Sequence, residues 1–200
     1  MPRHVLFLVA STRASGEVGN TEWLAHEAAR ALAADDWQTW LHLARMDLPA
    51  FVDQRHTVGR YPMPEGDLRL LLDATLAASD LVFVMPIYWF SIPAPLKLYL
   101  DHWSAFLRVD GLGFKEAMAT KTLRAIITSG DRAKAQPAID SLRLCAQFLG
   151  MRWGTGAPAP DDEQAVLWGK GGAPGAVRAD GAALGRARSF LQNEWHSLDN

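Results

Sequence analysis

The chain has 200 residues, of which 49% are hydrophobic and 21% charged, and its formal net charge is −2. This composition is typical of a globular protein, and the length predicts a single domain over residues 1–200. The near-neutral charge argues against nucleic acid or an anionic membrane as a main partner. The one cysteine, Cys145, excludes an internal disulfide and a cysteine-ligated metal centre, and no metal is expected. No apolar run approaches the roughly 20 residues that cross a bilayer, which predicts a cytoplasmic protein.

The first half of the chain alternates apolar runs with amphipathic stretches. Asn20 is a good N-cap for the first helix, and Leu68, Leu71, Leu72 and Thr75 form the apolar stripe of the second. In chain order the sequence predicts a strand over 4–10, a polar loop over 11–20, a helix over 21–34, a strand over 37–43, an irregular stretch over 44–66 and a helix over 67–78. Loops as long as 44–66 are usually functional or mobile in compact domains.

The second half continues the same alternation, with Pro95 in the first turn of a helix and Gly150 at the end of another. We interpret the run W-G-K-G-G at 168–172 as part of a flexible surface loop, because no strand is expected to lead into it. The sequence predicts a strand over 81–85, a loop over 86–93, a helix over 94–106, a strand over 121–128, a loop over 129–134, a helix over 137–149, a strand over 151–157, a loop over 158–175 and a closing helix over 176–195.

Five strands that alternate with five helices predict an α/β protein with a doubly wound, five-stranded parallel sheet. The strands are apolar on both sides, so helices should cover both faces of the sheet. Ligands bind such sheets at the carboxyl ends of the strands, where the strand order reverses. We therefore expect the loops after the first, third and fourth strands to converge on one site.

The first of these loops has the sequence S-T-R-A-S-G-E-V-G-N-T and opens onto a helix. It offers several hydroxyl groups, the guanidinium of Arg13 and the free N–H groups of a helix start, which attract an anion. Its glycines lack the G-x-G-x-x-G spacing of a dinucleotide site, and it has no lysine for a nucleoside-triphosphate loop. The residues are consistent with a cradle for one phosphate, or with an ordinary capped loop.

The second loop carries three consecutive aromatic residues, Tyr88, Trp89 and Phe90, directly after a buried strand. Aromatic residues often cap a core, but three in a row between prolines fill a core inefficiently. Their rings could instead wall a planar ligand. The pattern favours a ring-binding site at this strand end.

Two motifs in these loops carry a family resemblance. Residues Pro86, Tyr88, Pro93, Ala94, Leu96, Lys97 and Asp101 match P-x-Y-x-x-x-x-P-A-x-L-K-x-x-x-D, and Ser11, Arg13, Gly19, Asn20, Thr21, Leu24 and Ala25 match S-x-R…G-N-T-x-x-L-A. With both motifs in order, the chain resembles the NAD(P)H-dependent FMN reductase and quinone reductase family of the flavodoxin-like superfamily. The resemblance covers residues 5–130, and the remainder only by the order of its elements.

The resemblance implies that FMN is the cofactor and NAD(P)H the reductant. Hydride would pass from the nicotinamide to N5 of FMN and then to a small acceptor such as a quinone, in a homodimer, without a catalytic acid, base or nucleophile. The expected cofactor-binding residues are Ser11, Arg13, Asn20 and Thr21 for the phosphate, Pro86, Ile87, Tyr88, Trp89 and Phe90 for the ring, and Ser129 and Gly130 for its far edge. The acceptor and the preference between NADPH and NADH stay open.

Two alternatives keep the same fold: a flavodoxin-type electron carrier and a non-catalytic FMN-binding regulator. Carriers of this type tend to be strongly acidic, which this chain is not. A phosphate-accepting receiver domain is rejected, because it needs an acidic cluster after the first strand and an aspartate at the end of the third. Those strands end at Ala10 and Met85 instead.

A few residues outside the three loops also invite an interpretation. We expect Lys97 and Asp101, four residues apart on a helix, to form a structural pair. The resemblance places His102 and Trp103 at a dimer contact. We expect His56 and Arg60 to lie on the solvated surface.

Overall fold

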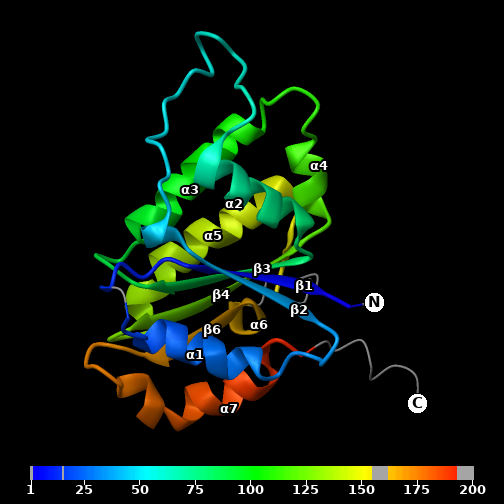
Figure 1. Ribbon diagram of the computed structural model, residues 1–200. Helices are drawn as coiled ribbons and strands as arrows, with labels where there is room; N and C mark the ends of the chain where they lie inside the picture. The colour runs from blue at the N-terminus through cyan, green and yellow to red at the C-terminus, as the bar shows by residue number, and fades with distance from the viewer. Residues whose placement is uncertain (1, 15, 155–161, 193–200) are drawn as a thin grey trace.

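The computed structural model describes residues 2–14, 16–154 and 162–192. A parallel β-sheet crosses the centre of the molecule between two layers of helices (Figure 1). The strand order is β2-β1-β3-β4-β5, with β6 also paired to β4, so the order reverses between β1 and β3. The strands are β1 (His4–Val9), β2 (Trp37–His42), β3 (Asp80–Pro86), β4 (Thr122–Ser129), β5 (Arg152–Trp153) and β6 (Val166–Lys170). The prediction of a doubly wound parallel sheet is confirmed.

The helices divide between the two faces of this sheet. Helices α1 and α7 lie against one face, and α2, α3, α4 and α5 lie against the other (Figure 1). The helices are α1 (Asn20–Ala29), α2 (Gly66–Ala77), α3 (Ala94–Phe106), α4 (Phe114–Ala119), α5 (Gln136–Leu149), α6 (Asp162–Ala165) and α7 (Gly181–Phe190), with 3-10 turns η1 (Leu43–Arg45), η2 (Ala133–Ala135) and η3 (Ala176–Ala179). None of the helices in the described ranges is long and apolar enough to span a membrane.

Two hydrophobic cores flank the sheet, because successive side chains of a strand point to opposite faces. In β1, Leu6 and Leu8 belong to the core under α2 and α3, whereas Val5, Phe7 and Val9 belong to the core under α1 and α7. All five side chains are at most 1% exposed. Burial on both faces fixes the register of the strands, and with it the positions of the loops at their carboxyl ends.

The fifth strand is interrupted, and here the sequence prediction is wrong in part. Strand β5 contains only two residues and pairs with the start of β4, and β6 takes over beside Ala125–Ser129. The loop expected over 158–175 therefore contains a strand, and the W-G-K-G-G run begins inside it. The remaining expected strand residues, 155–157, lie outside the described part of the chain.

Strand β6 escaped the prediction because its glycines resemble loop residues. A Cβ atom on Gly169 would lie 2.7 Å from a methyl group of Val177 and 2.8 Å from one of Leu24. Glycine is needed there for the close approach of α1 and η3 to the strand.

Three helix predictions also need correction. Helix α1 is capped by Gly19 rather than by Asn20 and ends at Ala29, and α4 was not expected. The closing helix is broken into η3 and α7, because the carboxylate of Asp180 accepts hydrogen bonds from the N–H groups of Lys170 and Ala183. Its expected last residues, 193–195, are not among those described. By contrast, α3 and the buried stripe of α2 agree with the prediction.

Candidate functional site

The carboxyl ends of β1, β3, β4 and β6 surround a cavity of about 280 Å³. This is close to the lower end of the range for small-molecule sites. Nine of the eleven residues expected at the cofactor line it: Ser11, Arg13, Asn20, Thr21, Pro86, Ile87, Tyr88, Ser129 and Gly130. The convergence of the three loops on one site is therefore observed.

One end of the cavity is formed by the N-terminus of α1. No side chain in the described part of the chain caps this helix, and Gly19 occupies the N-cap position in an extended conformation. The first N–H groups of the helix are thus available to an anion, and the helix dipole favours negative charge there. A Cβ atom on Gly19 would lie 3.2 Å from Nε of Arg13, so the glycine also leaves room for the guanidinium.

The polar side chains at this end differ in how firmly they are held. The hydroxyl groups of Thr21 and Thr128 are 2.5 Å apart and buried, which ties the start of α1 to β4. Asn20 donates from Nδ2 to the carbonyl of Ala173, 2.9 Å away, and so ties the first loop to the chain after β6. Asn20 is therefore a bracing residue in this structure, not the N-cap.

Arg13 lies at the mouth of the cavity. Its guanidinium contacts the carboxylate of Glu17 at 3.2 Å, and both side chains are substantially exposed. Exposed ion pairs of this kind contribute little stability. A phosphate could therefore replace Glu17 as the partner of Arg13 at small cost.

The other end of the cavity is formed by the loop after β3. Tyr88 and Ser91 close a tight turn with two backbone hydrogen bonds of 3.4 and 3.0 Å. The two residues between them, Trp89 and Phe90, have φ angles of +49° and +62°. Left-handed backbone costs about 1–2 kcal/mol per residue when a side chain is present, and such strain persists mainly at functional sites.

The three aromatic residues of this turn differ in their exposure and in whether they line the cavity. Tyr88 lines the cavity, and its hydroxyl lies 3.4 Å from Oγ1 of Thr12 in the first loop. Trp89 is 92% exposed and Phe90 52% exposed, and neither lines the cavity. The structure thus does not bring Trp89 and Phe90 to the cavity wall, and their contact with a ring stays a prediction.

Sequence reasoning did not assign to the cofactor five residues that line the cavity: Gly19, Glu22, Thr128, Gly171 and Gly172. Gly171 packs against the end of β4, where a Cβ atom would lie 3.2 Å from the backbone nitrogen of Ser129. Its own N–H donates to the carbonyl of Ser129 at 2.7 Å. The pair of glycines after the short apolar run 166–168 was the signal that could have revealed this wall.

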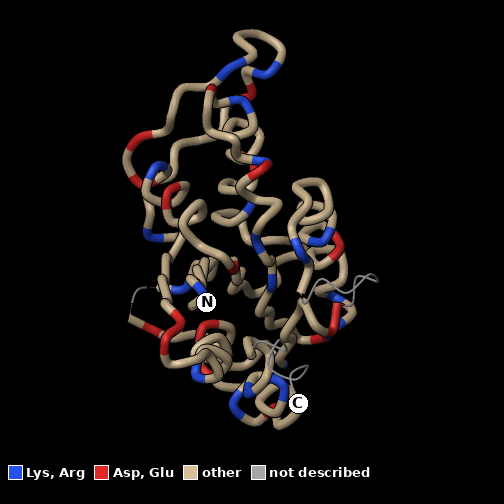
Figure 2. Tube along the Cα trace, turned by 90° about the vertical axis from the view of Figure 1, so that its right-hand side faces the viewer, with Lys and Arg blue, Asp and Glu red and all other residues tan. Residues whose placement is uncertain are grey.

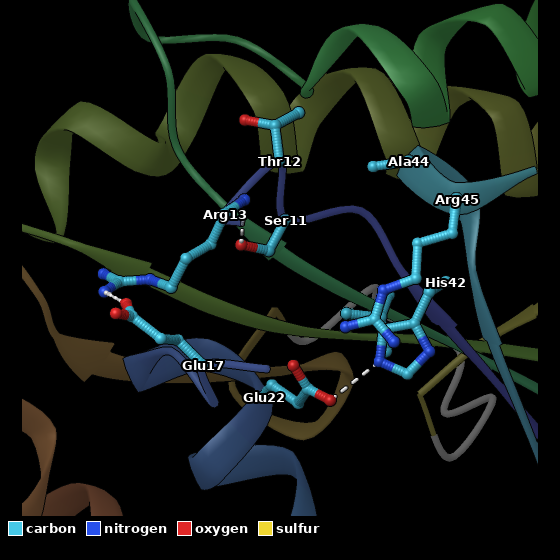
Figure 3. Close-up of a pocket in the computed structure, with 9 residues that line it drawn as sticks. Ser11, Thr12, Arg13, Glu17, Glu22, His42, Ala44 and Arg45 are labelled. Atoms are coloured by element: carbon cyan, nitrogen blue, oxygen red, sulfur yellow. Dashed lines mark hydrogen bonds and ion pairs between the residues drawn. The ribbon is translucent and has the colours of Figure 1, made fainter. Parts of the chain in front are cut away.

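A second cavity, of about 210 Å³, lies on the β2 side of the first loop (Figure 3). It shares Ser11, Arg13 and Glu22 with the first cavity, and His42 and Arg45 complete its far side. Oε1 of Glu22 lies 2.8 Å from Nε2 of His42, the last residue of β2. Glu22 thus separates the two cavities with its charge directed toward the histidine.

The remaining expectations have different outcomes. Lys97 and Asp101 form the expected ion pair on α3, at 2.5 Å, and Arg60 is an exposed surface residue paired with Asp110. His102 and Trp103 are only 6% and 5% exposed within the chain, so their side chains offer little surface to a second subunit, and their place at a subunit contact stays a prediction. Nε2 of His102 lies 2.8 Å from the carbonyl of Pro49 and thereby anchors the long loop on α3.

Two proteins of Bacillus subtilis are similar to this chain over most of its length. A Bacillus subtilis protein, YwqN, named as an NAD(P)H-dependent FMN-containing oxidoreductase, is 29% identical over 177 residues, which cover 87% of this chain and 90% of that protein. The solved structure of a Trp repressor binding protein from Bacillus subtilis superposes with a TM-score of 0.68 at 26% identity, over 94% of this chain and 97% of that one.

A more distant structure shares the fold. The NAD(P)H:quinone oxidoreductase of Methanothermobacter marburgensis superposes with a TM-score of 0.61 at 18% identity, over 94% of each chain. Residues 3–162 match the family model described as the flavodoxin-like fold. The chain belongs to the flavodoxin-like fold family.

Proposed function

We propose that this protein is an FMN-dependent NAD(P)H oxidoreductase that passes hydride from a nicotinamide through FMN to a small acceptor such as a quinone. One observation carries the proposal: an uncapped helix start and a strained aromatic turn, far apart in the sequence, border the same cavity. The relative YwqN, which covers most of both chains, is named for the same cofactor and the same class of reductant.

The residues at the cavity fit the two ends of FMN. The N–H groups at the start of α1, the hydroxyl of Ser11 and the guanidinium of Arg13 form a donor set for a phosphate. Tyr88 offers an aromatic wall, and Gly130 and Gly171 have no side chains that would obstruct a planar ring. Bound FMN would supply the chemistry by accepting hydride at N5 and passing it on.

The protein's own contribution is binding and orientation. The hydrogen bond between the hydroxyls of Thr21 and Thr128 ties the start of α1, at the phosphate end, to β4. The strained turn contributes Tyr88 to the cavity wall and leaves Trp89 exposed to solvent. No side chain need donate or remove a proton for this reaction. We propose a single-domain, cytoplasmic homodimer as the working form.

The surface charge favours an enzyme over a carrier protein. Lys, Arg, Asp and Glu are interspersed along the chain trace, without one sign collecting on a face of this view (Figure 2). The formal net charge of −2 gives little electrostatic steering toward a basic partner protein.

The test is an anaerobic titration of the FMN-loaded protein with NADPH and with NADH, followed by flavin absorbance. We expect direct bleaching of the flavin by at least one nucleotide and recovery of the absorbance when a quinone is added. A bound flavin that neither nucleotide reduces would favour the electron carrier. A protein that does not bind FMN, and whose melting temperature FMN does not change, would contradict the proposal altogether.

A further inference from the structure

The second cavity, on the β2 side of the first loop, is not needed for the FMN site proposed above. Its walls come from the end of β1 and the following loop on one side, and from His42, Ala44 and Arg45 on the other (Figure 3). It shares Ser11, Arg13 and Glu22 with the cavity proposed for FMN, so the two cavities adjoin at the first loop and the start of α1.

The charged side chains around the second cavity differ in whether they have a partner. Glu17 is paired with Arg13 at 3.2 Å, and Glu22 with His42 at 2.8 Å. Arg45 also lines the cavity, but it forms no ion pair or side-chain hydrogen bond with any residue in the described ranges. Figure 3 shows its side chain on the same side of the cavity as that of His42. The cavity is therefore lined by two carboxylates that each have a partner and by the guanidinium of an exposed arginine without a partner in the described ranges, which is available to an anion.

The chemistry of arginine and the place of the cavity narrow the choice of anion. A guanidinium presents a planar fork of donors that matches a phosphate. In the proposed reaction, the phosphate that distinguishes one reductant from another is the 2′-phosphate of NADPH, and the cavity lined by Arg45 adjoins the one proposed for FMN. Strand β2 ends at His42 and the next turn supplies Arg45, while Glu22, the buried acid of this cavity, is already bound by His42.

We propose that this cavity is a subsite for the 2′-phosphate of NADPH, with Arg45 as its specificity-determining residue. The inference rests on the proposed function and adds to it a preference for NADPH over NADH. Arg45 contacts the 2′-phosphate and nothing that reacts, so it affects binding of one nucleotide and leaves hydride transfer unchanged. The carboxylate of Glu22 is bound at Oε1 by Nε2 of His42, 2.8 Å away, rather than by Arg45.

The direct test is calorimetric titration of the FMN-loaded protein with 2′,5′-ADP and with 5′-AMP, which differ only in the 2′-phosphate. We expect tighter binding of 2′,5′-ADP, and a loss of about ten- to hundredfold in its affinity when Arg45 is replaced by alanine. The affinity for 5′-AMP should not change. Arg45→Lys, which retains the charge but not the fork, should fall between the two.

Arg30→Ala is the matched control, because it removes the same charge from an exposed residue at the end of α1. In steady-state assays Arg45→Ala should raise KM for NADPH by a similar factor, with kcat and the kinetics of NADH unchanged. Equal binding of 2′,5′-ADP and 5′-AMP to the wild-type protein, or an Arg45→Ala variant that still distinguishes them, would overturn the inference.

The two proposals fail in distinguishable ways. If neither nucleotide reduces the bound FMN, the proposed function is wrong. If both reduce it and Arg45→Ala has no effect on either, only the subsite is wrong. If Arg45→Ala instead weakens the binding of FAD relative to FMN and leaves 2′,5′-ADP unaffected, the cavity belongs to the adenylate of a flavin and the NADPH assignment is overturned.

Discussion

The charged groups at the two ends of the sheet differ in how firmly other residues bind them. At the amino ends of the strands, buried charges are held by partners: Arg124 lies 2.9 Å from Asp80, Arg3 lies 2.8 Å from Asp36, and the ammonium of Lys121 donates to the carbonyls of Leu76 and Ala78. At the carboxyl ends, the helix start is uncapped, Arg13 is held by an exposed glutamate and Arg45 has no partner in the described ranges. One end uses its charges to hold the strands together, and the other leaves donors available for a ligand.

At the amino ends of the strands, pairing also changes the pKa of a carboxylate. Burial alone would raise the pKa of Asp36, but hydrogen bonds from the backbone and guanidinium of Arg3 lower the pKa of that carboxyl below its usual value. Asp36 therefore adds stability at neutral pH, and this contribution is lost as the pH falls through its lowered pKa. Substitution of a paired charge at the amino ends of the strands should destabilise the protein. Substitution of a donor at the carboxyl ends should instead weaken ligand binding.

The largest effect is expected from Asp80→Asn. This change leaves Arg124, which is 6% exposed, without its charged partner, and breaking a buried pair in this way costs about 3–5 kcal/mol. Equilibrium unfolding in denaturant measures the loss, and the affinity of the folded protein for FMN should stay unchanged. The control is Asp110→Asn, which removes the partner of Arg60 in an exposed pair and should cost less than about 1 kcal/mol.

A second prediction concerns the interior between the two ends. Tyr99 is fully buried, and burial raises its pKa to about 12 from an ordinary value of 10.0. Because the unfolded chain loses this proton first, the free energy of unfolding should be unaffected below pH 10 and should fall by roughly 3 kcal/mol between pH 10 and 12.

The variant Tyr99→Phe isolates that contribution. It lacks the ionisable hydroxyl, while Oγ1 of Thr75 keeps its hydrogen bond to the carbonyl of Leu71. The difference in unfolding free energy between wild type and variant should shrink as the pH rises from 10 to 12. A difference that is constant over this range would show that Tyr99 titrates normally.

A smaller effect is expected from Arg13→Ala at the carboxyl end. The loss of one charged donor to a phosphate should weaken FMN binding by about tenfold or more. Because Arg13 is paired only with an exposed Glu17, the melting temperature of the apoprotein should hardly change. Fluorescence titration of the apoprotein measures the affinity. An equal loss of apoprotein stability would contradict the contrast between the two ends.

The smallest expected effect is a gain in the stability of the apoprotein. Trp89→Gly replaces a strained, 92% exposed residue by one that accepts a left-handed backbone, so the apoprotein should become about 1 kcal/mol more stable. Trp37→Gly, at an exposed strand position without this strain, is the control and should destabilise. If Trp89→Gly also destabilises, the turn is not a store of strain.

The sequence predicts the elements whose signals are local. Helix α3 begins and ends where its prolines and apolar spacing indicate, and the stripe of Leu68, Leu71, Leu72 and Thr75 is buried as expected. The first and second loops meet because parallel strands place their carboxyl ends together.

What the sequence does not predict depends on distant contacts. Strand β6 is a strand because β4 extends past the end of β5, which no local pattern reports. Trp89 and Phe90 have a left-handed backbone, are exposed and do not line the cavity, although their residue types favour a ring-binding wall. Within the chain, His102 is covered by the long loop after β2, and Trp103 packs against Tyr99 and Phe114.

The most direct measurement is the structure of the protein with FMN bound. We predict that the phosphate lies at the N-terminus of α1, between Ser11, Arg13 and Thr21, and that the ring lies against Pro86–Tyr88 with its other edge at Gly130. A phosphate bound elsewhere, or a ring that does not touch the turn after β3, would contradict the account.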